Sequence, residues 1–266
     1  MSPFVESRPR TTLRAFVAGF AYIVGLTATS TAALAAPDGG VAGPTVALGD
    51  GSGYAWVRRD RGGKPIAFGL SIDDAALTKL GGEHTKTTFP LPTVDGLPFR
   101  TIVVDWEPKG HPPTAVYGVP HFDFHAYVID ESAREAIAAD GPSGPVMPAP
   151  DLVPDGYIAP MPSTVPKMGL HFGFAGAAEF HGGTFAATPI YGYSDGHFAF
   201  VESMIALSYL KSLPTASGTI ALPPRVETTG AYPQRWAVTH DNQSGRYEIG
   251  FEGLAIRVSA INVTRP

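Results

Sequence analysis

Residues 119–129 read Val-Pro-His-Phe-Asp-Phe-His-Ala-Tyr-Val-Ile, an aromatic and β-branched stretch that predicts a β-strand. Successive side chains of a strand point to opposite faces. The polar face of this strand consists of His121, Asp123, His125 and Tyr127. The apolar face consists of Phe122, Phe124, Ala126 and Val128. The alternation predicts a strand whose two faces meet different surroundings.

The composition of the whole chain agrees with a β-rich fold. Its 266 residues include 31 Gly, 26 Pro, 15 Phe and 10 Tyr, without a collagen period. Such a composition predicts short strands joined by many turns. We therefore expect a mainly β fold, a single antiparallel β-barrel or sandwich with a few short helices. A cupin-like barrel is attractive because it holds His and Glu on interior strand faces, although the cupin spacing motifs are not present.

The N-terminal segment has the pattern of a secretory signal peptide. Three arginines between positions 8 and 14 precede an apolar stretch at 15–27, and Ala33-Leu34-Ala35 matches the small-x-small cleavage pattern. We expect residues 1–35 to be a signal peptide and residues 36–266 to be a single β-dominated domain. The protein would then be exported to the periplasm or the extracellular space. An uncleaved N-terminal anchor is the alternative.

The charge of the chain limits its partners, and its cysteine content limits the sources of its stability. The formal net charge is −5, and it becomes −7 without residues 1–35, which contain three Arg and one Glu. Scattered, mildly acidic charges predict no nucleic-acid partner. Beyond the N-terminal segment no stretch is apolar for long enough to cross a bilayer, so we expect a protein that is not membrane-embedded. The chain has no cysteine, so stability must come from an apolar core, to which a homo-oligomeric interface can contribute.

Turn and capping residues predict the local elements. The expected hairpins join 53–58 with 65–70 and 184–193 with 197–202. Short helices are expected at 71–81, 131–140 and 203–212, and an antiparallel meander at 235–240, 247–251 and 254–263. Residues 141–167 are dense in proline and predict an irregular loop, which is either a lid, an interface arm or a surface wrap.

Three residues from other segments extend the polar face of the first strand into a candidate site. His171 points away from the face that carries Leu170, Phe172 and Phe174. His111 lies in a turn before the strand. Glu202 shares its parity with Phe198 and Phe200, which puts a carboxylate on a face that should be buried. A buried carboxylate needs a cation, a hydrogen-bond donor or a proton.

Three imidazoles and one carboxylate from different strands suit a divalent transition metal such as Zn, Mn, Fe, Cu or Ni. The predicted metal ligands are His121, His125, His171 and Glu202. Asp123 would ligate directly, orient an imidazole, or act as a catalytic general base. About 13 Å separates the Cα atoms of His121 and His125 along a strand, which leaves open that only one of them ligates. The alternative is an ordinary solvent-facing strand, with Glu202 paired to Lys or Arg.

Four blocks of the sequence resemble an uncharacterised family of exported bacterial proteins with a Pro-His-Phe-Asp-Phe-His signature. The blocks are Tyr117–Tyr127, Val165–His171, Ile190–Gly196 and Phe200–Met204. The resemblance spans about Tyr54 to Val263. It implies that one set of residues acts together: His121, Asp123, His125, Met168, His171 and Glu202. Phe172 and Ser203 depart from the family pattern, which has Trp and Pro at these places.

Two functional hypotheses follow. The first is an exported protein with a His/Asp/Glu metal site in a β-barrel pocket, acting as a metal-dependent enzyme on a small molecule. The second is a non-catalytic envelope or stress-associated protein, ligand-binding or oligomeric, in which the same cluster is a structural polar network. No nucleophile elbow, His-Glu-x-x-His, P-loop or dinucleotide fingerprint is present, so no organic cofactor is expected.

Overall fold

The computed structural model describes residue 1 and residues 40–138, 145–159, 164–212 and 215–259. Contacts divide the chain into Met1–Ala32 and Ala33–Pro266, and the elements below belong to the second unit. Nearly all of the predicted signal peptide lies outside the described residues, and it stays a prediction. Among the helices of the described residues, none has the length and apolar character needed to traverse a bilayer.

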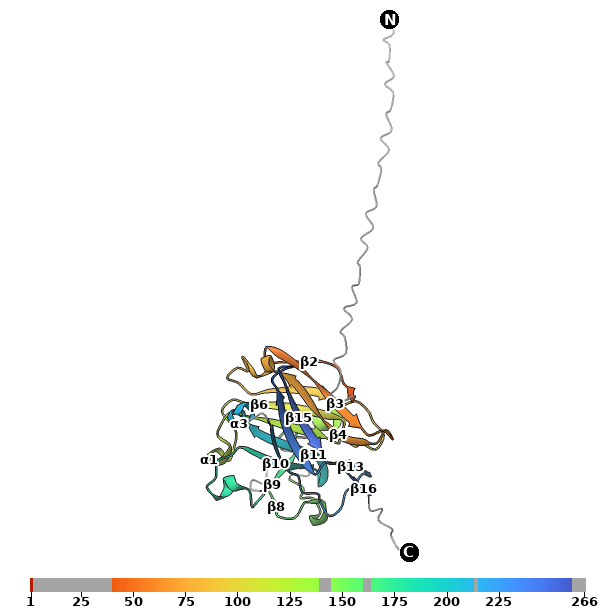
Figure 1. Ribbon diagram of the computed structural model, residues 1–266, viewed down its shortest axis with the longest axis vertical. Helices are drawn as coiled ribbons and strands as arrows, with labels where there is room; N and C mark the ends of the chain where they lie inside the picture. Colours follow the sequence, from red (N-terminus) through yellow and green to blue (C-terminus); the bar gives the residue numbers. More distant parts are fainter. Residues whose placement is uncertain (2–39, 139–144, 160–163, 213–214, 260–266) are drawn as a thin grey trace. The chain divides into compact units, whose positions relative to one another are not determined.

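Most of the strands in the described residues belong to two antiparallel seven-stranded sheets (Figure 1). The first sheet follows the order β1 (Val41–Ala42), β3 (Gly51–Arg59), β4 (Pro65–Asp73), β15 (Arg246–Glu252), β14 (Arg235–Asp241) and β12 (Thr215–Thr219), with β2 (Val46–Leu48) also paired to β3. The second follows the order β5 (Thr85–Pro90), β6 (Thr101–Glu107), β7 (His121–Tyr127), β11 (His197–Ala206), β10 (Ala187–Ser194), β9 (Leu170–Phe174) and β8 (Tyr157–Ile158).

The remaining elements are short. A two-stranded sheet joins β13 (Gly230–Tyr232) to β16 (Ala255–Arg257). The α-helices are α1 (Thr114–Tyr117), α2 (Glu131–Glu135) and α3 (Leu207–Ser212). The 3₁₀-helices are η2 (Asp74–Leu77), η3 (Pro150–Leu152) and η4 (Ala178–His181). The prediction of a mainly β, antiparallel fold with a few short helices is confirmed.

The main core lies between the two large sheets. Phe122 and Phe124 of β7 belong to the same buried cluster as Phe68 and Leu70 of β4. Phe68 stacks on Phe251 with ring centroids 5.1 Å apart. Neither large sheet closes on itself in the described part of the chain, and β1 and β8, at two of the sheet edges, are only two residues long. The arrangement is therefore a sandwich, and the expected cupin-like barrel is wrong.

Both predicted hairpins form, as β3–β4 and β10–β11. The expected helix at 71–81 is wrong, because Ser71–Asp73 extends β4 and only Asp74–Leu77 turns into η2. Asp73 caps that turn, whereas Ser71 pairs with Tyr54 and Glu248 on the neighbouring strands. Sheet pairing has overridden the local helix signal.

The other expected elements are shorter than the sequence suggested. The helix predicted from residue 131 ends at Glu135, and β11 continues through Ala206 before α3 begins. β14 and β15 form the expected hairpin. The third strand of the expected meander forms over Ala255–Arg257 but pairs with β13, so the meander is wrong, and residues 260–263 lie outside the described residues. The proline-rich loop contains η3 and β8, while residues 139–144 and 160–163 lie outside the described residues.

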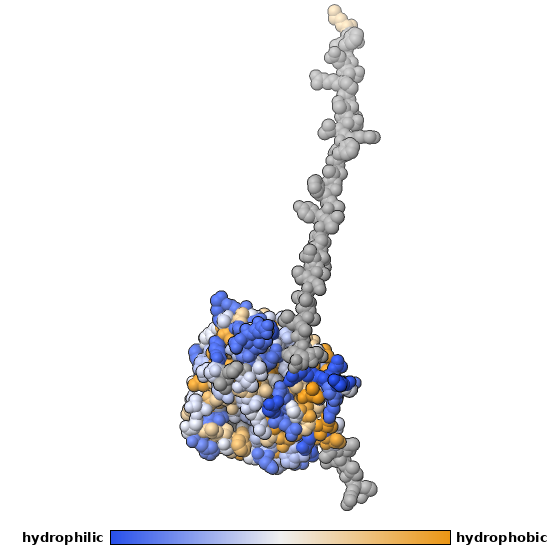
Figure 2. Space-filling model, in the orientation of Figure 1, coloured by the Kyte–Doolittle hydropathy of each residue, from blue (hydrophilic) through white to orange (hydrophobic). Residues whose placement is uncertain are grey.

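The face drawn in Figure 2 is mixed, with hydrophobic residues in small patches between hydrophilic ones. Isolated apolar side chains are common on protein surfaces. Among the described residues, Ile158 and Phe174 on the edge strands β8 and β9 are 51% and 43% exposed. The edge of the second sheet is therefore partly apolar.

Candidate metal centre

The polar face of β7 is buried on the outer side of the second sheet. His121, Asp123 and His125 are 0%, 3% and 1% exposed. Their face packs with a second apolar cluster that includes Tyr117 of α1, Met168 and Phe185. The predicted alternation of the two faces is confirmed. The alternative of a solvent-facing strand is wrong, because the segments that carry Tyr117, Met168 and Phe185 cover the polar face of β7.

Strand register brings acidic residues next to this face. His125 is paired with Glu202 of β11, and Asp123 is paired with Asp105 of β6. His171 comes from β9, on the far side of β10. A β-bulge between Gly192 and Tyr193 reverses the parity of β11. For that reason Phe198 contacts the core between the sheets, while Phe200 lies on the side of Glu202. The expectation that the two rings share one face of the strand is therefore wrong.

The first cluster consists of His125, His171 and Glu202. Oε2 of Glu202 lies 3.4 Å from Nε2 of His125 and 4.0 Å from Nε2 of His171. The other ring nitrogen of His125 lies 3.4 Å from Oδ2 of Asp105. Within the described part of the protein, neither nitrogen of His125 and neither of these two oxygens has a hydrogen-bond partner.

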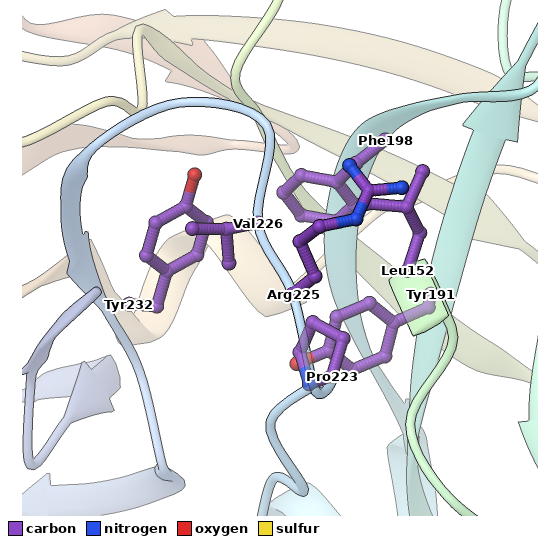
Figure 3. A pocket seen from close by; sticks show the side chains of 7 residues that line it. All are labelled: Leu152, Tyr191, Phe198, Pro223, Arg225, Val226 and Tyr232. Atoms are coloured by element: carbon purple, nitrogen blue, oxygen red, sulfur yellow. The ribbon is translucent and has the colours of Figure 1, made fainter. Parts of the chain in front are cut away.

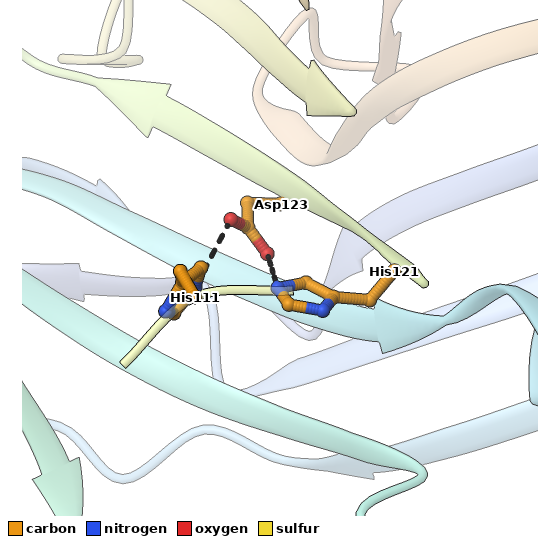
Figure 4. Close-up of side chains that lie close together, drawn as sticks. All are labelled: His111, His121 and Asp123. Atoms are coloured by element: carbon orange, nitrogen blue, oxygen red, sulfur yellow. Dashed lines mark ion pairs between the residues drawn. The ribbon is translucent and has the colours of Figure 1, made fainter. Parts of the chain in front are cut away.

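The second cluster consists of His111, His121 and Asp123, whose side chains point toward one another in Figure 4. Nε2 of His121 lies 3.2 Å from Oδ1 of Asp123, and Nε2 of His111 lies 3.5 Å from Oδ2. Nδ1 of His121 is 2.7 Å from the carbonyl oxygen of Val119. A carbonyl oxygen only accepts, so this nitrogen carries the proton and donates it.

A third cluster, His84, Asp105 and Glu107, is different because it contains its own cation. Lys86 Nζ and His84 Nε2 lie 2.6 and 2.8 Å from Oδ1 of Asp105. Asp105 is fully buried, and its charge is already compensated. Asp105 therefore contacts Lys86 and His84 with one oxygen and faces His125 with the other. A carboxylate in this position typically orients a metal-binding imidazole.

Nitrogen–oxygen separations distinguish these clusters. Ligands bound to one ion at about 2.1 Å lie about 3.0–3.4 Å apart in octahedral or tetrahedral geometry, whereas N–H···O hydrogen bonds are most frequent near 2.9 Å. Gaps of 3.2–3.5 Å in the first two clusters are close to the ligand spacing, and His171 at 4.0 Å needs a small inward movement. In the third cluster His84 is hydrogen-bonded to Asp105 at 2.8 Å, while its 3.3 Å separation from Glu107 falls in the ligand range.

Burial and neighbouring charges shift the pKa values of the first cluster and of Asp105. Burial alone would lower the pKa of His125, but the charges of Glu202 and Asp105 raise it to about 9. Burial raises the pKa of Glu202 to about 7. Burial and the neighbouring His125 lower the pKa of His171, which therefore keeps a free lone pair at neutral pH. Burial would raise the pKa of Asp105, but His125 and Lys86 bring it to about 2.

Residues of both clusters, His121 excepted, line a cavity of about 480 Å³. His111, Asp123, His125, His171 and Glu202 contribute polar groups to it. Its apolar walls include Pro112, Pro113, Val165, Met168, Phe180 and Ile190. A second cavity, shown in Figure 3 between Tyr191, Phe198 and Arg225, has about 10 Å³ and holds at most one water molecule. Only the first of these two can admit a small molecule.

The structure divides the predicted residues between two clusters. His125, His171 and Glu202 come together, whereas His121 lies with Asp123 and His111. Sequence reasoning missed Asp105, although its parity with Val103 and Glu107 on a clear strand was visible. The sequence does not give the order of the strands in the sheet, and this order places Asp105 beside Asp123 and close to His125.

Comparison with known proteins adds no family to these observations: no family model, no curated protein and no solved structure matches the chain. The resemblance to exported proteins with a Pro-His-Phe-Asp-Phe-His signature therefore stays an expectation.

Proposed function

We propose that this chain is an exported, metal-dependent enzyme that binds a divalent transition metal through His125, His171 and Glu202. The ion would activate a water molecule or polarise a substrate oxygen within the cavity. Three protein ligands leave a coordination position for water or substrate, as catalytic metal sites require.

The environment of His125 is the observation that carries the proposal. The ring is 1% exposed and lies between two carboxylates, with neither nitrogen hydrogen-bonded to any described residue. A proton on Nδ1 would face Asp105, which leaves the lone pair of Nε2 directed at Glu202. A lone pair facing a carboxylate oxygen is repulsive unless a proton or a metal ion lies between them.

The cavity supports an enzyme rather than a closed structural site. His171 is 27% exposed, so the cluster is reached from the cavity, while His125 and Glu202 form its buried floor. Apolar walls such as Phe180 and Ile190 can contact the carbon part of a small substrate and exclude water around the ion.

A structural polar network is the second candidate, and one observation favours it. The raised pKa of His125, about 9, means that an imidazolium could take the place of the metal between Asp105 and Glu202. In that case the cluster would be an ion-pair network without catalytic activity, in an envelope or stress-associated protein. Metal content separates the two candidates.

The experiment is elemental analysis of protein purified without a histidine tag, followed by titration of chelator-treated protein with Zn²⁺ or Mn²⁺. We expect tight binding and a rise in thermal stability, about 2.7 kcal/mol when the free ion reaches 100 times its Kd. His171→Asn should lose one ion per chain. His197→Asn is the matched control, since His197 is 72% exposed and pairs with Glu227. A protein that binds none of the five candidate metals would refute the proposal.

A further inference from the structure

We infer that His111, His121 and Asp123 form a second divalent-metal site, so that the cavity holds two ions. The dinuclear arrangement rests on the proposed function of the first cluster, whereas the second site stands on its own geometry. It lies one step further along the polar face of β7, where Asp123 and His125 are two residues apart.

Backbone carbonyls fix the histidines of the second site in one orientation. Nδ1 of His121 donates to the carbonyl oxygen of Val119 at 2.7 Å, and Nδ1 of His111 donates to that of Pro112 at 2.9 Å. In each neutral ring the lone pair is then on Nε2. A carbonyl partner of this kind typically orients a metal-binding imidazole.

Both lone pairs are directed at a single carboxylate. Nε2 of His121 faces Oδ1 of Asp123 at 3.2 Å, and Nε2 of His111 faces Oδ2 at 3.5 Å (Figure 4). Nε2 of His121 and Oδ1 of Asp123 are buried, and neither has a hydrogen-bond partner in the described residues. Two imidazoles and a bidentate carboxylate give an ion four protein contacts, with open positions toward the cavity.

Each of the two sites has a ligand from a segment that contributes nothing to the other site, so the two sites can be removed separately by mutation. His111 lies in the turn before α1 and is half-buried, so its replacement disturbs no strand. His171 belongs to β9 and to the first cluster only. Neither residue is shared between the two clusters.

The test is metal stoichiometry of the full chain by native mass spectrometry, with Co²⁺ absorption as a spectroscopic readout. The wild type should bind two ions, and His111→Asn and His171→Asn one ion each, with complementary halves of the Co²⁺ spectrum. His181→Asn, an exposed histidine bonded to the Ala175 carbonyl, should keep both ions.

Each contrary result identifies what is wrong. If the wild type binds one ion that His171→Asn loses and His111→Asn keeps, the second site is refuted and the proposed function stands. If the one ion is lost in His111→Asn and kept in His171→Asn, the second site stands and the proposed function is refuted. If neither variant differs from the wild type, both are refuted. Asp123→Asn, which keeps the side-chain volume, provides a second variant for the same comparison.

Discussion

Asp105 and Asp123 are direct cross-strand partners on β6 and β7, and both are buried. Like charges at opposed positions of a sheet destabilise it. The pair is tolerated because each carboxylate has cationic or imidazole partners on its other side: Lys86 and His84 for Asp105, and His111 and His121 for Asp123. The outer face of the second sheet is therefore organised around two acidic residues.

Asp105→Asn tests the link between these residues and the first cluster. The amide removes the negative charge that faces Nδ1 of His125 at 3.4 Å, while the volume of the side chain stays nearly the same. We expect the metal affinity of the first site to fall about 10–100-fold. Isothermal titration with Zn²⁺ measures it, with Glu107→Gln as the control because Glu107 contacts His84 and not His125. Unchanged affinity would show that Asp105 does not orient His125.

Gly192→Ala tests the packing behind the first site. A Cβ at residue 192 would lie 1.9 Å from a ring atom of Phe200, which packs on His125 and His171 at centroid distances of 4.9 and 5.3 Å. We expect the displaced ring to cost about 1–3 kcal/mol of unfolding free energy and to weaken metal binding at the first site. Gly82→Ala is the control, since a Cβ there has no neighbour within 4 Å. Equal stability and affinity of the two variants would contradict this prediction.

Glu248→Gln tests a titrating group outside the cavity. Burial raises the pKa of Glu248 from 4.5 to about 7, although Ser71 donates a hydrogen bond to it and Arg246 lies nearby. A raised pKa in the folded state means that the contribution of this group is largest below pH 4.5 and is lost as the pH rises through about 7.

The glutamine variant should therefore gain stability relative to the wild type between pH 5 and pH 8. One pKa unit corresponds to about 1.4 kcal/mol, and partial solvent exposure reduces the effect, so we expect about 1–2 kcal/mol. Urea denaturation of both proteins at the two pH values measures it. A difference that does not change with pH would mean that Glu248 stays ionised throughout.

Phe122→Ala tests the core between the sheets. Phe122 is 0% exposed and packs against the rings of Trp106 and Phe124, with centroids 4.8 and 5.8 Å away. Its truncation should lower the free energy of unfolding by about 3–5 kcal/mol. Ile66→Ala on β4, 45% exposed, should change it by less than about 1 kcal/mol. Similar losses in the two variants, measured by chemical denaturation, would contradict the sandwich packing.

The sequence was most informative where one periodic signal was long and complete. Alternation predicted both faces of β7, and turn residues predicted the hairpins β3–β4 and β10–β11. Parity alone also set His171 apart from Leu170 and Phe172, which belong to the core between the sheets.

Features that depend on distant partners could not be predicted. The β-bulge opposite Gly192 and Tyr193 places Phe198 and Phe200 on opposite sides of the sheet. No local sequence pattern predicts this bulge. The capping signal at Ser71 was real, but pairing with β3 and β15 kept that residue in a strand. The division of the histidines into two clusters depends on the turn that brings His111 to Asp123, a contact between segments that sequence spacing does not encode.

The central place of β7 in its sheet has a consequence for metal loading. Its backbone is paired along its whole length, with β6 on one side and β11 on the other. Amide protons of such a strand should exchange with solvent only on global unfolding. The proposed ligands on this strand are therefore preorganised, and an ion could leave and return without unfolding the strand. Coordination geometry would then be imposed by the scaffold on the metal, rather than by the metal on the scaffold.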